Sequence, residues 1–257
     1  MTEFEHLKTA WKTWRKCPKL FEYLFIEHHP PSDAVEMLLG RTFHEFAQSF
    51  HEKVDSLKLM ECTTAIDAMK VFEPLTVDQP IVKSWVENFK LFEVSRWLYF
   101  RRQFSKEEAL KYWKPLAAEL EIRFDELGRI HVDRIQLYDS MSLMNCEYKS
   151  GKTWDIRDLR SELTLYNIGI NKYGTFKLPC LWIGAYNPQL NLSFVERVTQ
   201  RSTSATWRSL MQFKDANNFS YKPSFFCRWC PRLQLCIDEK VFDMEVNNNA
   251  RTSDKNK

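Results

Sequence analysis

Glycine and long apolar runs are both scarce in this chain. Six glycines among 257 residues leave little room for flexible linkers, and no repeat period stands out, which favours one domain with appended segments. No stretch approaches the roughly 20 apolar residues that span a bilayer, and no apolar leader follows Met1. We therefore expect neither membrane insertion nor secretion, and predict an intracellular protein of the cytoplasm, or of the host cytoplasm if the chain is viral.

Charge of one sign is not in large excess either. The formal net charge of +3 is too small to indicate a nucleic-acid-binding protein by itself. Local clustering is more informative, because Lys12, Arg15, Lys16 and Lys19 surround Cys17 and tryptophan and tyrosine are interleaved with the basic residues. This mixture suits phosphate contacts combined with base stacking, or it is simply a solvated face.

The hydrophobic pattern predicts a mixed α/β fold. Helical periodicity covers three N-terminal stretches, residues 3–25 with a break at Cys17-Pro18, residues 34–60, and residues 67–113 with an aromatic core stripe of Phe89, Phe92, Trp97, Tyr99 and Phe100. The expected strands are residues 119–124, 129–137, 143–148, 178–186 and 191–198, with helices at 158–171 and 203–217. We expect one domain over residues 1–240, with a helical insertion at about 60–115 and a catalytic core at about 116–200. Residues 246–257 are polar and should be disordered.

Two acids and a lysine in the predicted strands suggest metal-dependent phosphodiester cleavage. Glu147 and Lys149 are two apart and should share one face of a strand, where pairing with the strand of Asp133 would bring all three groups together. Magnesium or manganese takes oxygen ligands, and the bound ion lowers the pKa of its water and neutralises charge on a phosphate. Lys149 could orient that water or stabilise the oxyanion. The alternative is an exposed strand face with cross-strand ion pairs.

The cysteines form an asymmetric pattern. The total is seven, an odd number, and a C-x2-C-x5-C group of Cys227, Cys230 and Cys236 is complemented by the remote Cys17. In a reducing compartment such spacing indicates a metal site before disulfides, and the thiolates could hold either zinc or an iron–sulfur cluster. The other three cysteines lie in apolar segments and are interpreted as buried packing residues: Cys62, Cys146 and Cys180.

Four short segments, taken in order, resemble the motifs of a nuclease superfamily. They are residues 40–44 (GRTFH), 129–135 (RIHVDRI), 147–149 (EYK) and 162–166 (ELTLY). The series is similar to the RecB/AddB-type branch of the PD-(D/E)XK superfamily, and the four cysteines are similar to those of its iron–sulfur members, particularly the small exonucleases of CRISPR adaptation modules. The likeness implies a restriction-endonuclease-like mixed sheet flanked by helices, an N-terminal helical region, and a 4Fe-4S cluster that joins the two ends of the chain, with zinc as the alternative.

The resemblance also implies roles for individual residues. His44, Asp133, Glu147 and the carbonyl of Tyr148 would bind magnesium or manganese, and Lys149 would be the catalytic lysine. The pair that would lie near the DNA is Tyr166 and Glu162. Two positions depart from the family pattern: His131 replaces a glycine, and Glu162 replaces a glutamine, so that an acceptor stands where an amide could also donate. Tyr166 could instead be core packing, and His44 an ordinary helix residue with His51 as the fallback ligand.

The function that these observations favour is a metal-dependent DNA nuclease. The resemblance implies an exonuclease that acts on single-stranded DNA or free DNA ends, in DNA repair, recombination or CRISPR-type processing. Two alternatives remain: a non-cleaving module that binds DNA ends or assembles a complex around an iron–sulfur cluster or zinc, and a zinc-stabilised protein whose acidic strand residues only face solvent.

Overall fold

The computed structural model describes residues 3–29 and 35–239. The chain divides into two units, Met1–Lys8 with Asp33–Met211, and Thr9–Ser32 with Gln212–Lys257. The tail at residues 246–257, predicted to be disordered, lies outside the described residues. The single nuclease domain expected over residues 1–240 stays a prediction.

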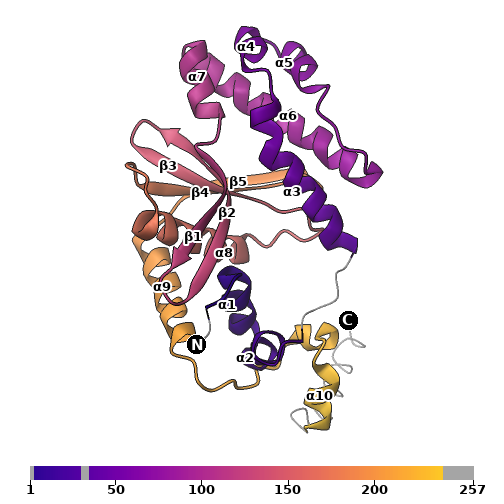
Figure 1. Cartoon of the computed structure of the whole chain (residues 1–257), viewed down its shortest axis with the longest axis vertical. Helices are drawn as coiled ribbons and strands as arrows, with labels where there is room; N and C mark the ends of the chain where they lie inside the picture. The colour runs from indigo at the N-terminus through magenta and orange to yellow at the C-terminus, as the bar shows by residue number, and fades with distance from the viewer. Residues whose placement is uncertain (1–2, 30–34, 240–257) are drawn as a thin grey trace, which may run out of the picture. The chain divides into compact units, whose positions relative to one another are not determined.

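The first unit is built on a five-stranded mixed sheet in the order β1-β2-β3-β4-β5 (Figure 1). The first three strands are antiparallel, β3 and β4 are parallel, and β5 is antiparallel to β4. A parallel pair needs a crossover connection, which α8 (Ile156–Tyr173) supplies between β3 and β4. The strands are β1 (Ala117–Phe124), β2 (Gly128–Asp139), β3 (Ser142–Tyr148), β4 (Cys180–Asn187) and β5 (Leu192–Arg197). The predicted α/β class with a mixed central sheet flanked by helices is confirmed.

The helical stretch before the sheet is more divided than the sequence pattern predicted. Asp55 accepts hydrogen bonds from the backbone N–H groups of Leu57 and Lys58 and thereby starts a new helix within the expected 34–60 element. Pro80 begins the longest helix, as a proline at the first helical position does. The helices of this region are α3 (Val35–Lys53), α4 (Ser56–Glu61), α5 (Ala65–Phe72), α6 (Pro80–Gln103) and α7 (Lys106–Trp113).

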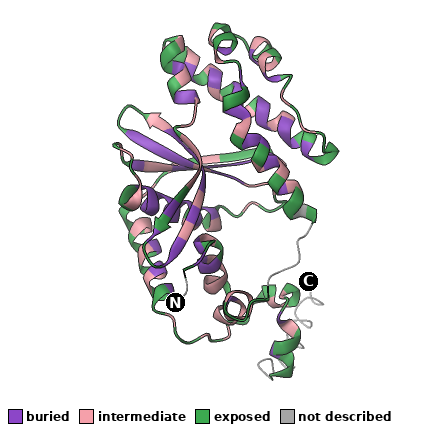
Figure 2. Ribbon diagram, in the orientation of Figure 1, coloured by how far each residue is buried: buried purple, intermediate pink, exposed green. Residues whose placement is uncertain are grey.

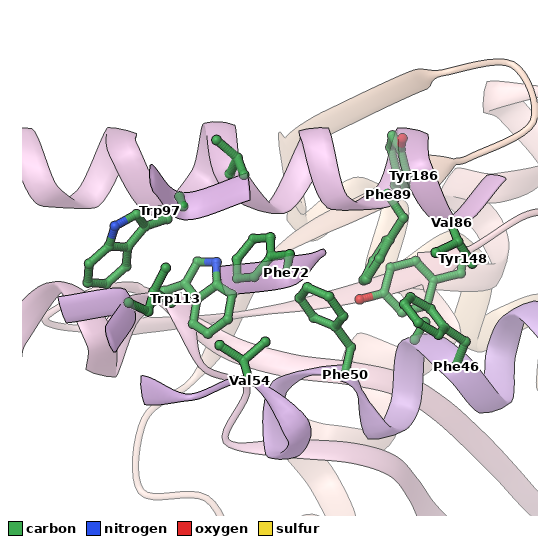
Figure 3. Packing of buried hydrophobic residues seen from close by; sticks show 14 of the residues in the cluster. Phe46, Phe50, Val54, Phe72, Val86, Phe89, Trp97, Trp113, Tyr148 and Tyr186 are labelled. Carbon is green, nitrogen blue, oxygen red and sulfur yellow. The ribbon is translucent and has the colours of Figure 1, made fainter. Parts of the chain in front are cut away.

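An aromatic core holds these helices against the sheet (Figure 3). Phe50 and Phe89 pack edge to face with ring centroids 5.1 Å apart, and Phe89 meets the ring of Tyr148, from β3, at 5.6 Å. Such pairs add to the stabilisation that burial of the rings provides. The predicted aromatic stripe was wrong for one residue, because Tyr99 is 59% exposed on the outer face of α6.

The middle strands β2 and β3 are largely buried, whereas β5 alternates between exposed and half-buried residues (Figure 2).

The second unit contains short helices from both ends of the chain. Phe21 packs against Phe213 and Phe219, with ring centroids 5.3 and 5.6 Å away, so the N-terminal and C-terminal segments of this unit share a core. α1 (Leu7–Lys16) and α9 (Gln200–Lys214) each belong partly to both units. The remaining helices of the second unit are α2 (Pro18–Phe21), η1 (Glu22–Ile26), η2 (Phe225–Trp229) and α10 (Leu233–Asp238).

A buried ionic network joins the helical layer of the first unit to β2. Glu93 of α6 accepts hydrogen bonds from Arg134 at 2.7 Å and Arg96 at 2.5 Å, and its Oε2 lies 3.1 Å from Nε2 of His51. His51 is only 3% exposed. Burial lowers the pKa of His51 to about 4, although the charge of Glu93 opposes that shift. His51 is therefore a buried member of this network with its Nε2 against Glu93, whereas His44 is the histidine that lies beside Asp133.

This network generates a prediction about acid stability. The pKa of His51 falls from 6.5 to about 4 on folding, so between these values the unfolded chain binds a proton at this position that the folded chain does not. Acidification through this window should lower the free energy of unfolding by up to about 1.4 kcal/mol per pH unit. We expect His51→Gln to remove this part of the pH dependence in urea titrations, because glutamine keeps a donor toward Glu93 but does not titrate. Equal pH slopes for parent and variant would contradict the assignment.

Candidate active site

The strand register brings Asp133, Glu147 and Lys149 together. The paired residues at this end of the β2–β3 ladder are Arg134 and Cys146, so the next positions along the two strands, Asp133 and Glu147, oppose each other. Side chains directly opposite in an antiparallel pair project from the same face of the sheet. Nζ of Lys149, two residues beyond Glu147, lies 2.6 Å from Glu147 Oε1. The face-sharing that the sequence implied is therefore present in the structure.

Asp133 is held by a backbone donor at the point where the β2–β3 ladder ends. Its Oδ2 accepts a hydrogen bond of 2.7 Å from the backbone N–H of Tyr148 and lies 3.5 Å from Nδ1 of His44. The side chain of Tyr148 is buried in the aromatic core, which fixes this donor (Figure 3). Burial, followed by the charge of Glu147, raises the pKa of Asp133 to about 7. His44, Lys8 and the backbone donor offset this rise only in part, and a bound cation would supply further compensation.

A third carboxylate, Glu119, joins Asp133 and His44 in a candidate cation site. One ligand atom from each of these residues can be chosen so that all three lie within 4.8 Å of one another. The β1–β2 ladder places Glu119 opposite Asp133, and α3 supplies His44. Glu119 has a φ of +48°, a left-handed conformation that strains any residue with a Cβ and recurs at functional sites.

Glu119 was missed by the sequence analysis, which placed it only at the start of a strand. The turn after β1 could have revealed it, because pairing of Phe124 with Gly128 across that turn sets Glu119 opposite Asp133 by simple counting.

Two ammonium groups hold one of the two carboxylate oxygens of Glu147. Nζ of Lys149 lies 2.6 Å and Nζ of Lys8 lies 2.9 Å from Oε1, while Oε2 is buried without a hydrogen-bond partner among the described residues. Burial would raise the pKa of Glu147, but the two lysines more than offset it and hold that pKa below the usual range. A buried carboxylate oxygen without a donor suits a cation as its missing partner.

Lys8 reaches the site because the start of the chain is anchored on the β1–β2 turn. Phe4 accepts a backbone hydrogen bond from Arg129 at 2.9 Å and donates one to Leu127 at 3.1 Å. Gly128, at a φ of +129°, allows this approach, since a Cβ there would lie 2.0 Å from the carbonyl oxygen of Phe4. The sequence spacing did not predict that Lys8 lies at the site, because these contacts join segments far apart in the chain.

Glu162 and Tyr166, expected near the DNA, line the buried side of the same site. Oε2 of Glu162 accepts a hydrogen bond of 3.0 Å from Lys149, so the acid that replaces the family's glutamine is an internal partner of the lysine. Tyr166 is fully buried, and Nζ of Lys8 lies 5.0 Å from the centre of its ring. Burial and the charges of Glu147 and Asp133 raise the pKa of Tyr166 well above its usual value, so the hydroxyl stays protonated. Contact of either residue with DNA stays a prediction.

The four cysteines singled out by their spacing line one cavity of about 220 Å³ in the second unit: Cys17, Cys227, Cys230 and Cys236. Their thiols are free. Two sulfurs accept hydrogen bonds, Cys227 from the backbone N–H of Ser224 at 3.2 Å and Cys236 from Arg232 at 3.1 Å. Burial, with smaller contributions from the three other thiols, raises the pKa of Cys230. The structure therefore gathers four sulfur donors from both ends of the chain around one space.

The other three cysteines lie outside this cavity. Cys62 and Cys180 are buried, as expected for packing residues, and Cys146 is half-buried within β3.

Comparison with known proteins gives a match to a family model and a similar crystal structure. The model of the PD-(D/E)XK nuclease superfamily matches residues 9–237. A crystal structure from Eubacterium rectale, named "Putative exonuclease", is similar at 11% identity with a TM-score of 0.43, over 88% of this chain and 93% of that chain. No curated protein matches the sequence. Since the superfamily model covers most of the chain, from the first helix to the last cysteine of the cavity, this protein belongs to the PD-(D/E)XK nuclease superfamily.

Proposed function

We propose that this protein is a divalent-metal-dependent DNA nuclease that hydrolyses phosphodiester bonds. The observation that carries the proposal is the alignment of Glu119, Asp133 and Glu147 on three neighbouring strands, with Lys149 bound to the last of them. Like charges at such positions repel each other in a buried setting unless a cation is shared between them. A module that only binds DNA would gain nothing from turning three carboxylates toward phosphate, so the structure favours hydrolysis over the non-cleaving alternative.

The donor set fits a hard divalent cation such as magnesium or manganese. His44, Glu119 and Asp133 would hold the ion, and the free Oε2 of Glu147 would complete the protein's share of the ligands. The carbonyl of Tyr148 remains a further proposed ligand. When bound, the ion supplies an acidified water and neutralises charge on the phosphate.

The protein's own residues then orient the reacting groups. Lys149, fixed between Glu147 and Glu162, keeps its ammonium beside the carboxylates, where it can donate a hydrogen bond to water or to a phosphate oxygen. Lys8 acts through Glu147: it shares Oε1 with Lys149, which would leave Oε2 available to a cation. We assign Lys8 as a positioning residue on this ground.

We further propose that Cys17, Cys227, Cys230 and Cys236 hold an iron–sulfur cluster. Hydrogen bonds to sulfur, as at Cys227 and Cys236, are typical of cluster ligands and tune their potential. The resemblance of the sequence motifs to the iron–sulfur branch of the superfamily supports the cluster. The same resemblance supports a proposed exonuclease activity on single-stranded DNA.

The nuclease proposal predicts that Asp133→Ala loses activity. Without this carboxylate, only His44 and Glu119 remain of the three residues in the candidate cation site. The rate of cleavage of an end-labelled single-stranded DNA, measured with added manganese, should therefore fall on the order of a thousandfold. Glu121→Ala, which removes an exposed acid from the neighbouring strand, is the matched control and should cleave at the parent rate. Parent-like cleavage by Asp133→Ala, or by the parent protein without divalent metal, would end the proposal.

The positioning role predicts a specific effect of Lys8→Met. Methionine keeps most of the length of the side chain without its charge, and Oε1 of Glu147 retains Lys149 as its partner. The turnover number should fall about tenfold, while the manganese concentration for half-maximal rate should not rise, because loss of a neighbouring ammonium favours cation binding. Lys58→Met, at an exposed ion pair on α4, should change neither quantity. An unchanged turnover number in Lys8→Met would show that Lys8 has no such role.

The cluster proposal predicts a structural defect in Cys230→Ala. A ligand bond that joins residues 17 and 236 closes most of the chain into a loop, so its free energy stabilises the second unit. We expect loss of visible absorption, faster proteolysis of both terminal segments and weaker DNA binding, with manganese binding at the active site retained. Cys62→Ala, outside the cavity, should keep the absorption. Protease resistance equal to that of the parent in Cys230→Ala would count against the proposal.

A further inference from the structure

Three large aromatic side chains project into solvent within five residues of the second unit. Phe225, Phe226 and Trp229 are 67%, 63% and 63% exposed. Phenylalanine and tryptophan usually bury most of their surface, so three exposed rings in one short segment mark a site of interaction. Phe226 and Trp229 line the cavity of the cysteines but remain largely exposed, and Phe225 is not among the residues that line it.

Basic groups lie over the faces of these rings. The guanidinium of Arg228 is 3.3 Å from the ring centre of Phe225 and 4.2 Å from that of Trp229. Nζ of Lys16 lies 5.5 Å from the ring centre of Phe226. Residues 216–237 contain no aspartate or glutamate, so the surroundings of the rings in the sequence are basic as well as aromatic. This combination of flat apolar faces with cations is complementary to bases and phosphates.

The segment that carries the rings is held in shape by its own hydrogen bonds. The backbone N–H of Cys227 donates to the carbonyl of Ser224 at 3.0 Å, and that of Cys230 donates to the carbonyl of Cys227 at 3.0 Å. The rings of Phe225 and Trp229 pack edge to face with centroids 5.0 Å apart. The aromatic groups are therefore presented on a fixed turn, and little conformational freedom remains to be lost when a ligand binds.

We propose that Phe225, Arg228 and Trp229 form a binding site for single-stranded nucleic acid, whose bases stack on the two rings while Arg228 contacts a phosphate. The proposal rests on the proposed function, since it names the form of the nucleic acid that the nuclease engages. Bases in a duplex are already stacked and offer no free face to a side chain, so the site selects single strands. A protein partner would also cover exposed rings, but the cations that lie over their faces, Arg228 and Lys16, favour a polyanion.

Fluorescence anisotropy of the full-length protein tests the site without cleavage. The probe is a labelled oligothymidine of about 16 nucleotides, in buffer without added divalent metal, compared with a blunt duplex of equal length. Phe225→Ala and Trp229→Ala should each weaken binding of the single strand about tenfold, as loss of one stacking partner does, and leave binding of the duplex nearly unchanged. Arg228→Met should lower the salt dependence of log K by about 0.7, the contribution of one phosphate contact. Tyr99→Ala, at an exposed ring of the first unit, is the control.

The outcomes separate this site from the nuclease proposal and from the cluster. Restored affinity in Trp229→Phe, with the visible absorption of all variants retained, would support stacking. Parent-like affinity in Phe225→Ala and Trp229→Ala, equal losses on the single strand and the duplex, or no binding of oligothymidine by the parent protein would each overturn the site. A loss of binding that appears only together with loss of absorption would also overturn it, because the rings would then shield the cluster. None of these results depends on whether Asp133→Ala abolishes cleavage.

Discussion

The repulsion among carboxylates gathered on one face of the sheet is the constraint on which the site depends. Glu119, Asp133 and Glu147 stand at aligned positions of three strands, and among the described residues only Glu147 has ammonium groups at hydrogen-bond distance, those of Lys8 and Lys149. The difference appears in the acid–base behaviour, since the pKa of Asp133 is raised to about 7 while that of Glu147 is held low. A cation at the end of the row nearest His44 would supply the missing positive charge.

The helical layer fixes this row from the opposite face of the sheet. Neighbouring residues on a strand point to opposite faces, so Arg134 and Tyr148 face away from the carboxylates that adjoin them. Arg134 donates to Glu93 at 2.7 Å and to the hydroxyl of Tyr148 at 2.9 Å, which ties β2 to β3 and both strands to α6. A register slip by one residue would bury the carboxylates in the aromatic core and expose this network. The hydrogen bonds and packing on one face of the sheet thus maintain the positions of the carboxylates on the other face.

Much of the site could be predicted from local sequence, and the remainder depends on long-range contacts. The two-residue spacing of Glu147 and Lys149 required only strand alternation, and Glu119 could have been found from the register that the turn at Gly128 imposes. Lys8 could not have been found in this way, because an amphipathic pattern predicts a helix but does not predict which strand the first turn of that helix contacts. The exposure of Tyr99 was missed for a similar reason, since the apolar stripe of α6 faces the sheet over only part of its circumference.

Anomalous scattering from a manganese-soaked crystal would show whether the carboxylates share a cation. We predict one manganese ion bound to Nδ1 or Nε2 of His44 and to carboxylate oxygens of Glu119 and Asp133, with Oε2 of Glu147 turned toward the metal and Oε1 still held by the two lysines. Manganese found only elsewhere, or a fully loaded crystal in which Asp133 binds no metal, would contradict it.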